Sequence, residues 1–389
     1  MNRKTQSDKT GQGMESLGLI PRRIVLKLGS AVLTRPGDER LDENLIDDIA
    51  MSVSRLFDEG REVIIVTSGA VAAGKGLLRI PRRSASIPEK QALAAVGQSR
   101  LMQVYSMHFE RYGRNIAQLL LTRDDMDDRR RYLNTNYAME KLLSLGVVPI
   151  INENDTTTVD ELRFGDNDGL SAMVAAKMKA EFLIILSDVD GLYDKDPRTN
   201  PDARLITRVE KVTPAIEAMA ANPPSRLGAG GMRSKIEAAR SATLAGTWAC
   251  ICCGKKPGIL GDLFAGRCPG TLFVPDSQKN LSGRERWIAF GKAGTNRWLV
   301  LDDGARKALV EGKKSLLAVG IRDVRGNFER GDVVEIRDGE GLRLGCGLIN
   351  FSSDEVRRIQ GARSEDVKRI LGQKEYNEVI HRDNMILFS

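Results

Sequence analysis

Short apolar runs alternate with longer amphipathic segments from residue 23 to residue 253. The runs are nearly continuous in hydrophobicity, which is typical of strands covered on both faces by helices. We predict strands at 24–28, 63–67, 116–121, 147–151, 182–186 and 247–253, and helices at 44–59, 89–112, 135–145 and 235–244. This alternation predicts an α/β domain over residues 23–275, built on an open, mostly parallel sheet sandwiched by helices.

Four glycines mark where the predicted helices should end. Gly60, Gly113, Gly146 and Gly246 each stand shortly before the next apolar run, and glycine is preferred just past a helix because it adopts positive φ. In parallel sheets the ligand binds outside the carboxyl ends of the strands. Functional residues are therefore expected directly after each run.

The pattern changes after residue 275. Short runs at 297–301, 316–319 and 332–336 are separated by glycines that we interpret as turns and bulges, namely Gly326, Gly331, Gly339, Gly341, Gly345 and Gly347. We predict a linker at 276–295, a small, mainly β domain at 296–374 and a C-terminal tail at 375–389. Residues 1–22 lack the apolar stretch of a signal peptide and are expected to form a disordered leader.

Composition narrows the class of protein. Of 389 residues 41% are hydrophobic and 29% charged, which predicts a soluble globular chain. The net charge of +7 favours anionic ligands without selecting among them. No apolar run reaches the roughly 20 residues that cross a bilayer, so no membrane association is expected. Five cysteines without an export signal indicate a reducing, cytoplasmic setting.

The first strand carries a lysine inside its apolar stretch. Lys27 would cost desolvation free energy there unless an anion neutralised it. Gly29 and Ser30 follow and leave donors for a phosphate. The strand alone is equally compatible with an edge lysine whose stem packs while its ammonium reaches water.

The segment after the second strand resembles the front of a P-loop. Gly69, Gly74 and Lys75 have the required spacing, but Gly76 stands where Ser or Thr must bind Mg²⁺, which disfavours that interpretation. The alternative is that Ser68 and its neighbours offer hydroxyl and N–H donors to a small anionic substrate, either a carboxylate or a phosphate.

The fourth strand is followed by an unusual concentration of amides and carboxylates: Asn152, Glu153, Asn154, Asp155, Asp166, Asn167 and Asp168. Turns use such residues one or two at a time. A Ca²⁺ loop is disfavoured because the EF-hand spacing and its closing Glu are absent. The other interpretation is a site that binds a substrate ammonium and holds catalytic lysines, although Asp166 or Asp168 can also cap a helix.

A glycine-rich segment, 228–231, leads into the helix that follows it. Such a turn at a helix N-terminus is a ready anion site, and Lys235 adds a mobile positive charge. An ordinary flexible loop is the plainer alternative. The nearby cysteines Cys250, Cys252 and Cys253 lack a second pair with zinc-finger spacing, so buried thiols in a core strand are expected and no metal site is predicted.

Taken in order, these motifs resemble one family. Val-Leu-Lys-Leu-Gly-Ser, Val-Thr-Ser-Gly-Ala-Val, Ala-Ala-Val-Gly-Gln-Ser (94–99), Ile-Asn-Glu-Asn-Asp, Gly-Asp-Asn-Asp, Ser-Asp-Val-Asp-Gly-Leu-Tyr (187–193) and Gly-Gly-Met together resemble the glutamate 5-kinases of the amino-acid kinase superfamily. The segment 326–332, with Gly345-x-Gly347 after it, is similar to a PUA domain. The resemblance covers about residues 23–384.

The resemblance implies a role for each matching residue. Lys27 and Lys235 would stabilise the transferred phosphoryl group, and Asp168 would organise them. Substrate contacts would come from Ser68, Asn152, Asp155, Asn167 and Arg163, the last standing where relatives can have lysine. The nucleotide would be held by Lys27, Gly29, Ser187, Asp188, Ala229, Gly230, Gly231, Met232, Arg233, Ser234 and Lys235, with Ala229 replacing a common threonine.

It also implies the reaction and the partners. ATP, with Mg²⁺, would phosphorylate the γ-carboxylate of L-glutamate in the first step of proline biosynthesis, with feedback inhibition by proline. A homo-oligomer (dimer or tetramer) and functional coupling to γ-glutamyl phosphate reductase are expected.

Two alternatives remain open. A sister kinase would act on aspartate, N-acetylglutamate, uridylate or carbamate. RNA binding through the PUA domain would make a different class of protein, but residues 281–389 hold 20 Lys and Arg against 17 Asp and Glu, whereas specific RNA binding usually shows a concentrated basic face. Aromatic residues, at 5%, are also few for base stacking. RNA is thus at most a secondary partner.

Overall fold

The computed structural model describes residues 21–35, 40–80, 86–157, 167–220, 231–267, 269–275, 297–372 and 376–387. The chain divides into two compact units, Met1–Gln278 and Lys279–Ser389. The proposed linker at 276–295 lies outside the described residues, and so does the proposed leader apart from Pro21 and Arg22.

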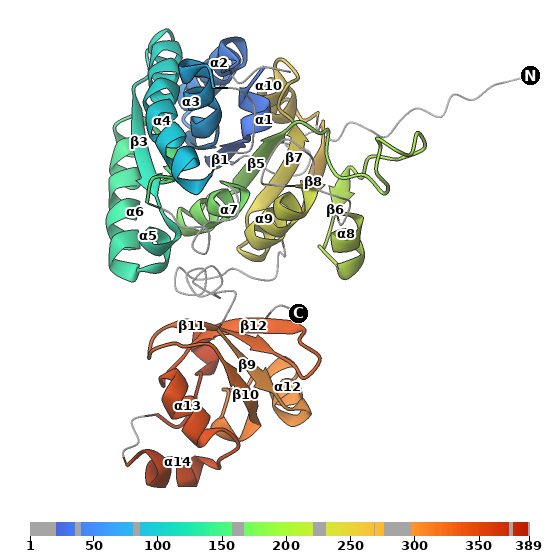
Figure 1. Ribbon diagram of the computed structural model, residues 1–389. Helices are drawn as coiled ribbons and strands as arrows, with labels where there is room; N and C mark the ends of the chain where they lie inside the picture. Colours follow the sequence, from blue (N-terminus) through green and yellow to red (C-terminus); the bar gives the residue numbers. More distant parts are fainter. Residues whose placement is uncertain are drawn as a thin grey trace, which may run out of the picture. The chain divides into compact units, whose positions relative to one another are not determined.

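The first unit is built on one eight-stranded sheet (Figure 1). Its strands are β1 (Arg23–Leu28), β2 (Glu62–Thr67), β3 (Ile116–Leu121), β4 (Val148–Glu153), β5 (Phe182–Ser187), β6 (Arg208–Val209), β7 (Trp248–Cys253) and β8 (Thr271–Phe273). They lie in the order β3-β4-β2-β1-β5-β7-β8-β6. Every pairing is parallel except β7 with β8. The predicted open, mostly parallel sheet is confirmed.

Helices connect these strands. They are α1 (Ser30–Leu33), α2 (Glu43–Asp58), α3 (Ala70–Leu78), α4 (Ile87–Glu110), α5 (Arg123–Asp127), α6 (Arg129–Ser144), α7 (Asn167–Lys177), α8 (Pro214–Met219), α9 (Met232–Leu244) and α10 (Ile259–Phe264). Gly60, Gly113, Gly146 and Gly246 all have positive φ, between 67° and 82°. The predicted helix stops are therefore confirmed at these glycines.

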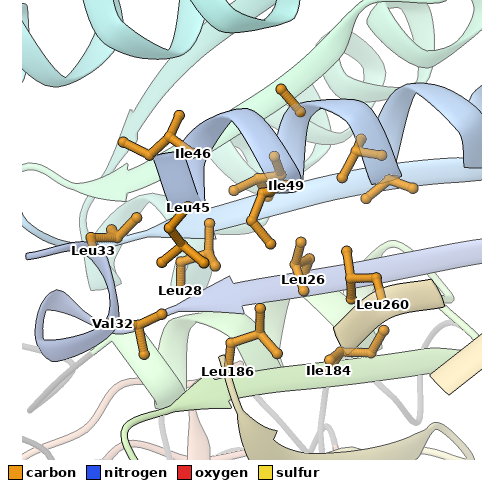
Figure 2. Packing of buried hydrophobic residues seen from close by; sticks show 14 of the residues in the cluster. Leu26, Leu28, Val32, Leu33, Leu45, Ile46, Ile49, Ile184, Leu186 and Leu260 are labelled. Atoms are coloured by element: carbon orange, nitrogen blue, oxygen red, sulfur yellow. The ribbon is translucent and has the colours of Figure 1, made fainter. Parts of the chain in front are cut away.

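The strands alternate their side chains between two helical layers. Leu26 and Leu28 of β1 pack with Ile184 and Leu186 of β5 against residues of α2, as Figure 2 shows. The intervening residue, Lys27, points to the other face because successive side chains on a strand point to opposite faces. Helices α7 and α9 cover that second face and contact each other. This alternation gives the sheet one apolar layer and one layer that carries chemistry.

Strand β1 lies inside the sheet, between β2 and β5. The interpretation of Lys27 as an edge-strand lysine is therefore wrong, and its side chain is only 4% exposed. The chain order reverses direction on the two sides of β1, which makes its carboxyl end a topological switch point. Ligands in open α/β sheets bind at such points.

The P-loop interpretation is also wrong. Gly74 and Lys75 lie within α3, not in a phosphate-binding loop. Gly74 and Gly97 serve helix packing. A Cβ on Gly74 would lie 2.1 Å from the carbonyl oxygen of Leu93, and a Cβ on Gly97 would lie 1.8 Å from the carbonyl oxygen of Ala70. These two glycines let the backbones of α3 and α4 come into direct contact.

The second unit holds a five-stranded sheet in the order β10-β9-β11-β12-β13. Its elements are β9 (Trp298–Leu301), α12 (Asp303–Val310), β10 (Ile321–Arg325), β11 (Val333–Arg337), β12 (Arg343–Leu348), α13 (Ser353–Ile359), α14 (Ser364–Leu371) and β13 (Met385–Leu387), with short 3₁₀ turns at Ala318–Gly320 and Arg382–Asn384. The predicted small β domain is thus found, together with three helices that the glycine pattern did not indicate.

Two sequence interpretations of this unit need correction. Gly345 and Gly347 lie inside β12 and not in turns, although Gly345 adjoins the register shift opposite Ile336 and Arg337 of β11. A Cβ on Gly345 would lie 2.2 Å from the carbonyl oxygen of Ile386. Strand β13 therefore requires glycine at 345, whereas a Cβ on Gly347 would lie 2.6 Å from Ile380 Cγ2 and 3.0 Å from the carbonyl oxygen of Asn384. The proposed tail at 375–389 also contributes β13, which pairs with β12, so the sheet extends beyond residue 374.

Neither unit shows a membrane-spanning element: among the described residues, no helix combines the length and the apolar character needed to cross a bilayer. Cys250 and Cys252 are buried in β7, and Cys346 is buried in β12. The expectation of buried thiols in a core strand is confirmed for Cys250 and Cys252, whereas Cys253 at the end of the same strand is only half-buried. Cys268 lies outside the described part of the chain.

Candidate active site

Polar side chains gather at the carboxyl ends of β1 and its neighbours, on the face of the sheet that α7 and α9 cover. Lys27 comes from β1, Ser68 directly follows β2, and Asn152 is the penultimate residue of β4. The first turn of α7 and the first turn of α9 face them with Asp168 and Lys235. Residues far apart in sequence thus meet where parallel strands end together.

Two buried lysines share one carboxylate at the centre of this site. Lys27 Nζ forms an ion pair with Asp168 Oδ1, and Lys235 Nζ lies 3.2 Å from Asp168 Oδ2. Asp168 is fully buried, and the lysines are 4% and 6% exposed. Buried charges persist only when paired. The arrangement therefore holds two ammonium groups beside each other on one carboxylate.

The start of α9 adds donors beside these ammonium groups. Ser234 Oγ lies 2.9 Å from Asp168 Oδ2 and 2.9 Å from the carbonyl oxygen of Gly231. Gly231 is the N-cap of this 13-residue helix. The first N–H groups of a helix carry a partial positive charge that favours anions. A ligand with several negative oxygens would find ammonium, hydroxyl and helix-end donors together here.

Asn167 organises the other half of the site. Its Nδ2 donates to the carbonyl oxygen of Thr67 at 2.6 Å, and also lies 2.9 Å from Ser68 Oγ and from Asn152 Oδ1. Within the described residues its buried Oδ1 makes no hydrogen bond. A buried acceptor without a donor carries a desolvation cost. This oxygen is therefore available to a substrate donor such as an ammonium group.

Side chains of α4 hold Asn152 and Thr67 in position through hydrogen bonds. Asn152 Nδ2 donates to Gln98 Oε1 at 2.8 Å, and Thr67 Oγ1 lies 2.8 Å from the hydroxyl of Tyr105. Burial raises the pKa of Tyr105 above its usual range, so the phenol stays protonated. Both partners come from α4.

The sequence indicates these two α4 residues to different degrees. Gln98 lies in the Ala94–Ser99 motif, but its pairing with Asn152 had no sequence signal. Tyr105 was missed, although its spacing from Leu101 placed it on the buried face of the predicted helix.

On the other side of the lysines, toward β5, the backbone leaves space for a ligand. A Cβ on Gly29 would lie 3.6 Å from Lys27 Nζ, so glycine leaves the space beside that ammonium open. Ser187, at the end of β5, is buried, and its Oγ lies 3.2 Å from Asp188 Oδ1. Asp188 is exposed. These residues form the edge of the site next to β5.

The remaining predicted residues are only partly placed. Asp155 is half-buried in the turn after β4, and Met232 is half-buried in the first turn of α9. Arg233 is exposed and pairs with Glu237 at 3.0 Å. Arg163, Ala229 and Gly230 lie outside the described residues, as does Asp166 in the stretch for which a Ca²⁺ loop was considered.

Comparisons with known proteins agree on one family. The model of the amino acid kinase family matches residues 22–253, and the PUA domain model matches residues 297–371. Glutamate 5-kinase from Syntrophotalea carbinolica is 47% identical over 366 residues, and that from Geobacter sulfurreducens is 48% identical over 366 residues. Each alignment covers 94% of this chain and 97% of the relative.

Solved structures of other kinases are more distant. Carbamate kinase from Giardia lamblia is 19% identical, with a TM-score of 0.49, and the alignment covers 66% of this chain and 99% of that one. An isopentenyl phosphate kinase from T. acidophilum is 16% identical, with a TM-score of 0.45, over 64% of this chain and 99% of that one.

Proposed function

The chain belongs to the amino acid kinase family and, within it, to the glutamate 5-kinases, and from this premise we propose that it transfers the γ-phosphoryl group of ATP to the γ-carboxylate of L-glutamate. The observation that carries the proposal is the pair of buried ammonium groups on Asp168. Their arrangement suits a transferred group that bears negative charge on several oxygens at once.

The acceptor needs no base. A glutamate γ-carboxylate has an ordinary pKa near about 4.3 and is already ionised at neutral pH. What remains is to bring two anions together and to neutralise charge in the transition state. Lys27 and Lys235 do this from two sides, while Asp168 keeps both ammonium groups aimed at the same point.

The acceptor would bind over the Asn167 network. Ser68 and Asn152 offer a hydroxyl and an amide to its carboxylates, and the unfilled Oδ1 of Asn167 faces its ammonium group. Asp155 supplies the opposite charge for that ammonium. Arg163 would act as a bidentate clamp on a carboxylate. A free ammonium group favours glutamate over an N-acetylated substrate.

The nucleotide would bind along the other side. Gly29 lets its γ-phosphate approach Lys27. Ser187 and Asp188 lie at the end of β5, and residues 229–235 lead the chain into the positive end of α9, where Gly231, Met232, Arg233 and Ser234 follow one another. These residues would hold the phosphates and the nucleoside.

Mg²⁺ fits this site as a companion of the nucleotide. The described residues contain no group of three or more His, Cys, Asp or Glu that could hold a metal. Magnesium in phosphoryl transfer usually keeps its waters and bridges phosphate oxygens, with one or two protein carboxylates. We propose that Asp188, exposed just after β5, would supply one such carboxylate. The metal would supply further neutralisation of phosphate charge.

The wider role follows from the family. We infer that the reaction is the first step of proline biosynthesis and that proline competes at the glutamate pocket. The acyl phosphate formed is labile, so we expect functional coupling to γ-glutamyl phosphate reductase in the cytoplasm. A homo-oligomer, dimer or tetramer, is also proposed. Added proline should raise the glutamate KM without lowering kcat.

A panel of acceptors tests the reaction. ADP release is measured with glutamate, aspartate, N-acetylglutamate, uridylate and carbamate. We expect turnover with glutamate far above the others. ADP release with aspartate and none with glutamate would overturn the assignment and favour a sister kinase.

Matched lysine variants test the mechanism. Lys27→Met and Lys235→Met should each lower kcat by about 10²–10³-fold, the usual effect of removing one preorganised charge from a transition state. Lys141→Met removes an exposed lysine of α6 and should leave kcat unchanged. Far-ultraviolet circular dichroism shows that each variant is folded. Near-normal turnover of either buried-lysine variant contradicts the proposed role.

A further inference from the structure

Gln98 begins a chain of three buried side-chain amides. Its Oε1 accepts from Asn152 Nδ2 at 2.8 Å, and Asn152 Oδ1 accepts from Asn167 Nδ2 at 2.9 Å. The three residues are between 2% and 9% exposed, and they come from α4, β4 and α7. The chain of amides therefore links the middle of α4 to the residue proposed to face the acceptor's ammonium group.

Two backbone groups fix the direction in which the amides point. The carbonyl oxygen of Thr67 can only accept, so the group of Asn167 that lies 2.6 Å from it is the NH₂ group. The N–H of Glu153 can only donate, so the atom of Asn152 that lies 2.9 Å from it is the oxygen. Asn152 must then turn its NH₂ group toward Gln98, and Gln98 must present its oxygen.

This direction leaves one atom at each end of the chain of amides without a partner. Within the described residues, Gln98 Nε2 and Asn167 Oδ1 are buried and make no hydrogen bond. An unpaired buried donor carries a desolvation cost, so the NH₂ group of Gln98 contributes nothing to the folded chain that would explain an amide here. Its oxygen does, because it is the acceptor for the buried NH₂ group of Asn152.

Removal of that oxygen would leave Asn152 Nδ2 in need of another acceptor. The neighbouring amide, that of Asn167, carries the unfilled Oδ1. If the Asn152 and Asn167 amides turned over, Asn152 Nδ2 would donate to Asn167 Oδ1. The oxygen that is to receive the ammonium group of the substrate would then be occupied.

We propose that Gln98 is a specificity-determining positioning residue. By accepting from Asn152, it keeps Asn167 Oδ1 directed at the substrate's ammonium group, so that the site favours an amino dicarboxylate over a dicarboxylate without an amino group. The inference rests on the proposed function, since it concerns the same acceptor site. It assigns the discrimination to an α4 residue that acts through two others.

Glutamate and glutarate differ only in the α-amino group, so their relative affinity tests the proposal. Titration calorimetry with saturating Mg²⁺ and adenylyl imidodiphosphate measures Kd for glutamate directly and for glutarate by displacement. Gln98→Met has a similar volume without the amide oxygen. It should lower the preference for glutamate over glutarate at least about tenfold, as expected from losing a hydrogen bond to a charged group. A loss of packing alone would weaken both ligands equally and leave their ratio unchanged.

Two further variants complete the test. Gln98→Glu keeps an oxygen for Asn152, and burial favours its neutral acid, whose hydroxyl replaces the unpaired Nε2. It should therefore retain the preference of the unmodified chain. Gln103→Met removes an exposed amide from the same helix and should also retain it.

The role of Gln98 is overturned if Gln98→Met keeps the full preference for glutamate, or if Gln98→Glu loses as much of it as Gln98→Met does. Either result leaves the proposed function intact, because the acceptor panel tests that function on the unmodified chain. Failure of the unmodified chain to bind glutamate would overturn the proposed function and this inference together.

Discussion

Replacement of Asp168 by asparagine is the sharpest test of the site, because it separates stability from catalysis. The side chain keeps its shape but loses the charge that two buried lysines share. At 3.2 Å and an effective dielectric constant of about 20, the attraction between Lys235 and Asp168 is worth about 5 kcal/mol before desolvation. Breaking a buried pair by removing one partner costs about 3–5 kcal/mol, and we expect Asp168→Asn to lower the free energy of unfolding by that amount.

Catalysis should respond differently. Without the shared carboxylate, the two ammonium groups repel each other and are no longer held toward the same point. We expect kcat to fall by about 10²–10³-fold. Adding Lys27→Met removes one of the uncompensated charges, so the double variant Asp168→Asn/Lys27→Met should regain part of the lost stability. It should regain no activity, because the lysine that would contact the phosphoryl group is then missing.

Urea unfolding followed by circular dichroism measures the first quantity, and ADP release measures the second. Glu210→Gln removes an exposed carboxylate 2.5 Å from Arg208 and should change neither, because exposed ion pairs contribute little. Two results would refute the reasoning. One is an Asp168→Asn variant with kcat within tenfold of the original, and the other is a double variant no more stable than the single one.

Three further predictions concern single residues of the first unit. Burial lowers the pKa of Lys177 from 10.5 to about 8, so the unfolded chain binds more protons between these values and stability rises with pH there. Relative to Lys177→Met, the unmodified chain should gain roughly 3 kcal/mol of unfolding free energy between pH 7 and pH 10.5, at about 1.36 kcal/mol per pKa unit, measured by urea unfolding. Gly97→Ala should cost several kcal/mol, on the order of an overpacked core, because the new methyl would lie 1.8 Å from the Ala70 carbonyl oxygen; the unfolding midpoint measures this. Gly29→Ala should leave that midpoint unchanged, since its Cβ would have only ordinary contacts at 3.6 Å, yet it should raise the KM for ATP by occupying space beside Lys27.

Each of these predictions has its own control. For the pH effect, a constant difference between the two proteins across the range would show that Lys177 does not titrate there. For the helix contact, Gly261→Ala adds a methyl in α10 where nothing lies within 4 Å, and an equal loss in both variants would contradict the steric argument. For Gly29→Ala, an unchanged KM for ATP would mean that the nucleotide does not approach this strand end.

The pattern of the sequence was sufficient for strands β1 to β5 and β7 and for helices α2, α4, α6 and α9 of the first unit, but it did not indicate the short strands β6 and β8. Parallel strands covered on both faces read as continuous apolar runs, and the glycines with positive φ ended the helices between them. The second unit was harder because its cues conflict. Strand β10 reads Ile-Arg-Asp-Val-Arg, with few apolar residues, and the glycines of β12 resemble turn residues. The close passage of β13 explains Gly345, and that of Ile380 and Asn384 explains Gly347. A contact between distant segments has no local signal.

The site divides in the same way. Residues at or just after the carboxyl ends of strands, such as Lys27, Ser68 and Asn152, could be predicted because parallel strands bring their ends together. The residues that hold these side chains in position could not be predicted. Gln98 and Tyr105 lie in the middle of α4, where their spacing predicts burial but not a polar partner. Their roles depend on how closely α3 and α4 pack. Gly74 and Gly97 permit this close packing, because a Cβ at either position would clash with the facing backbone.

One turn of helix joins the two halves of the site. Asn167 and Asp168 are consecutive at the start of α7, so their side chains point about 100° apart around the helix axis. The first reaches Thr67, Ser68 and Asn152 on the acceptor side, while the second reaches both lysines on the phosphoryl side. A shift of α7 would therefore misplace the acceptor and the charge that stabilises transfer together. The full burial of most of this helix between the sheet and α9 is then a condition of the chemistry, because neither half can be adjusted without the other.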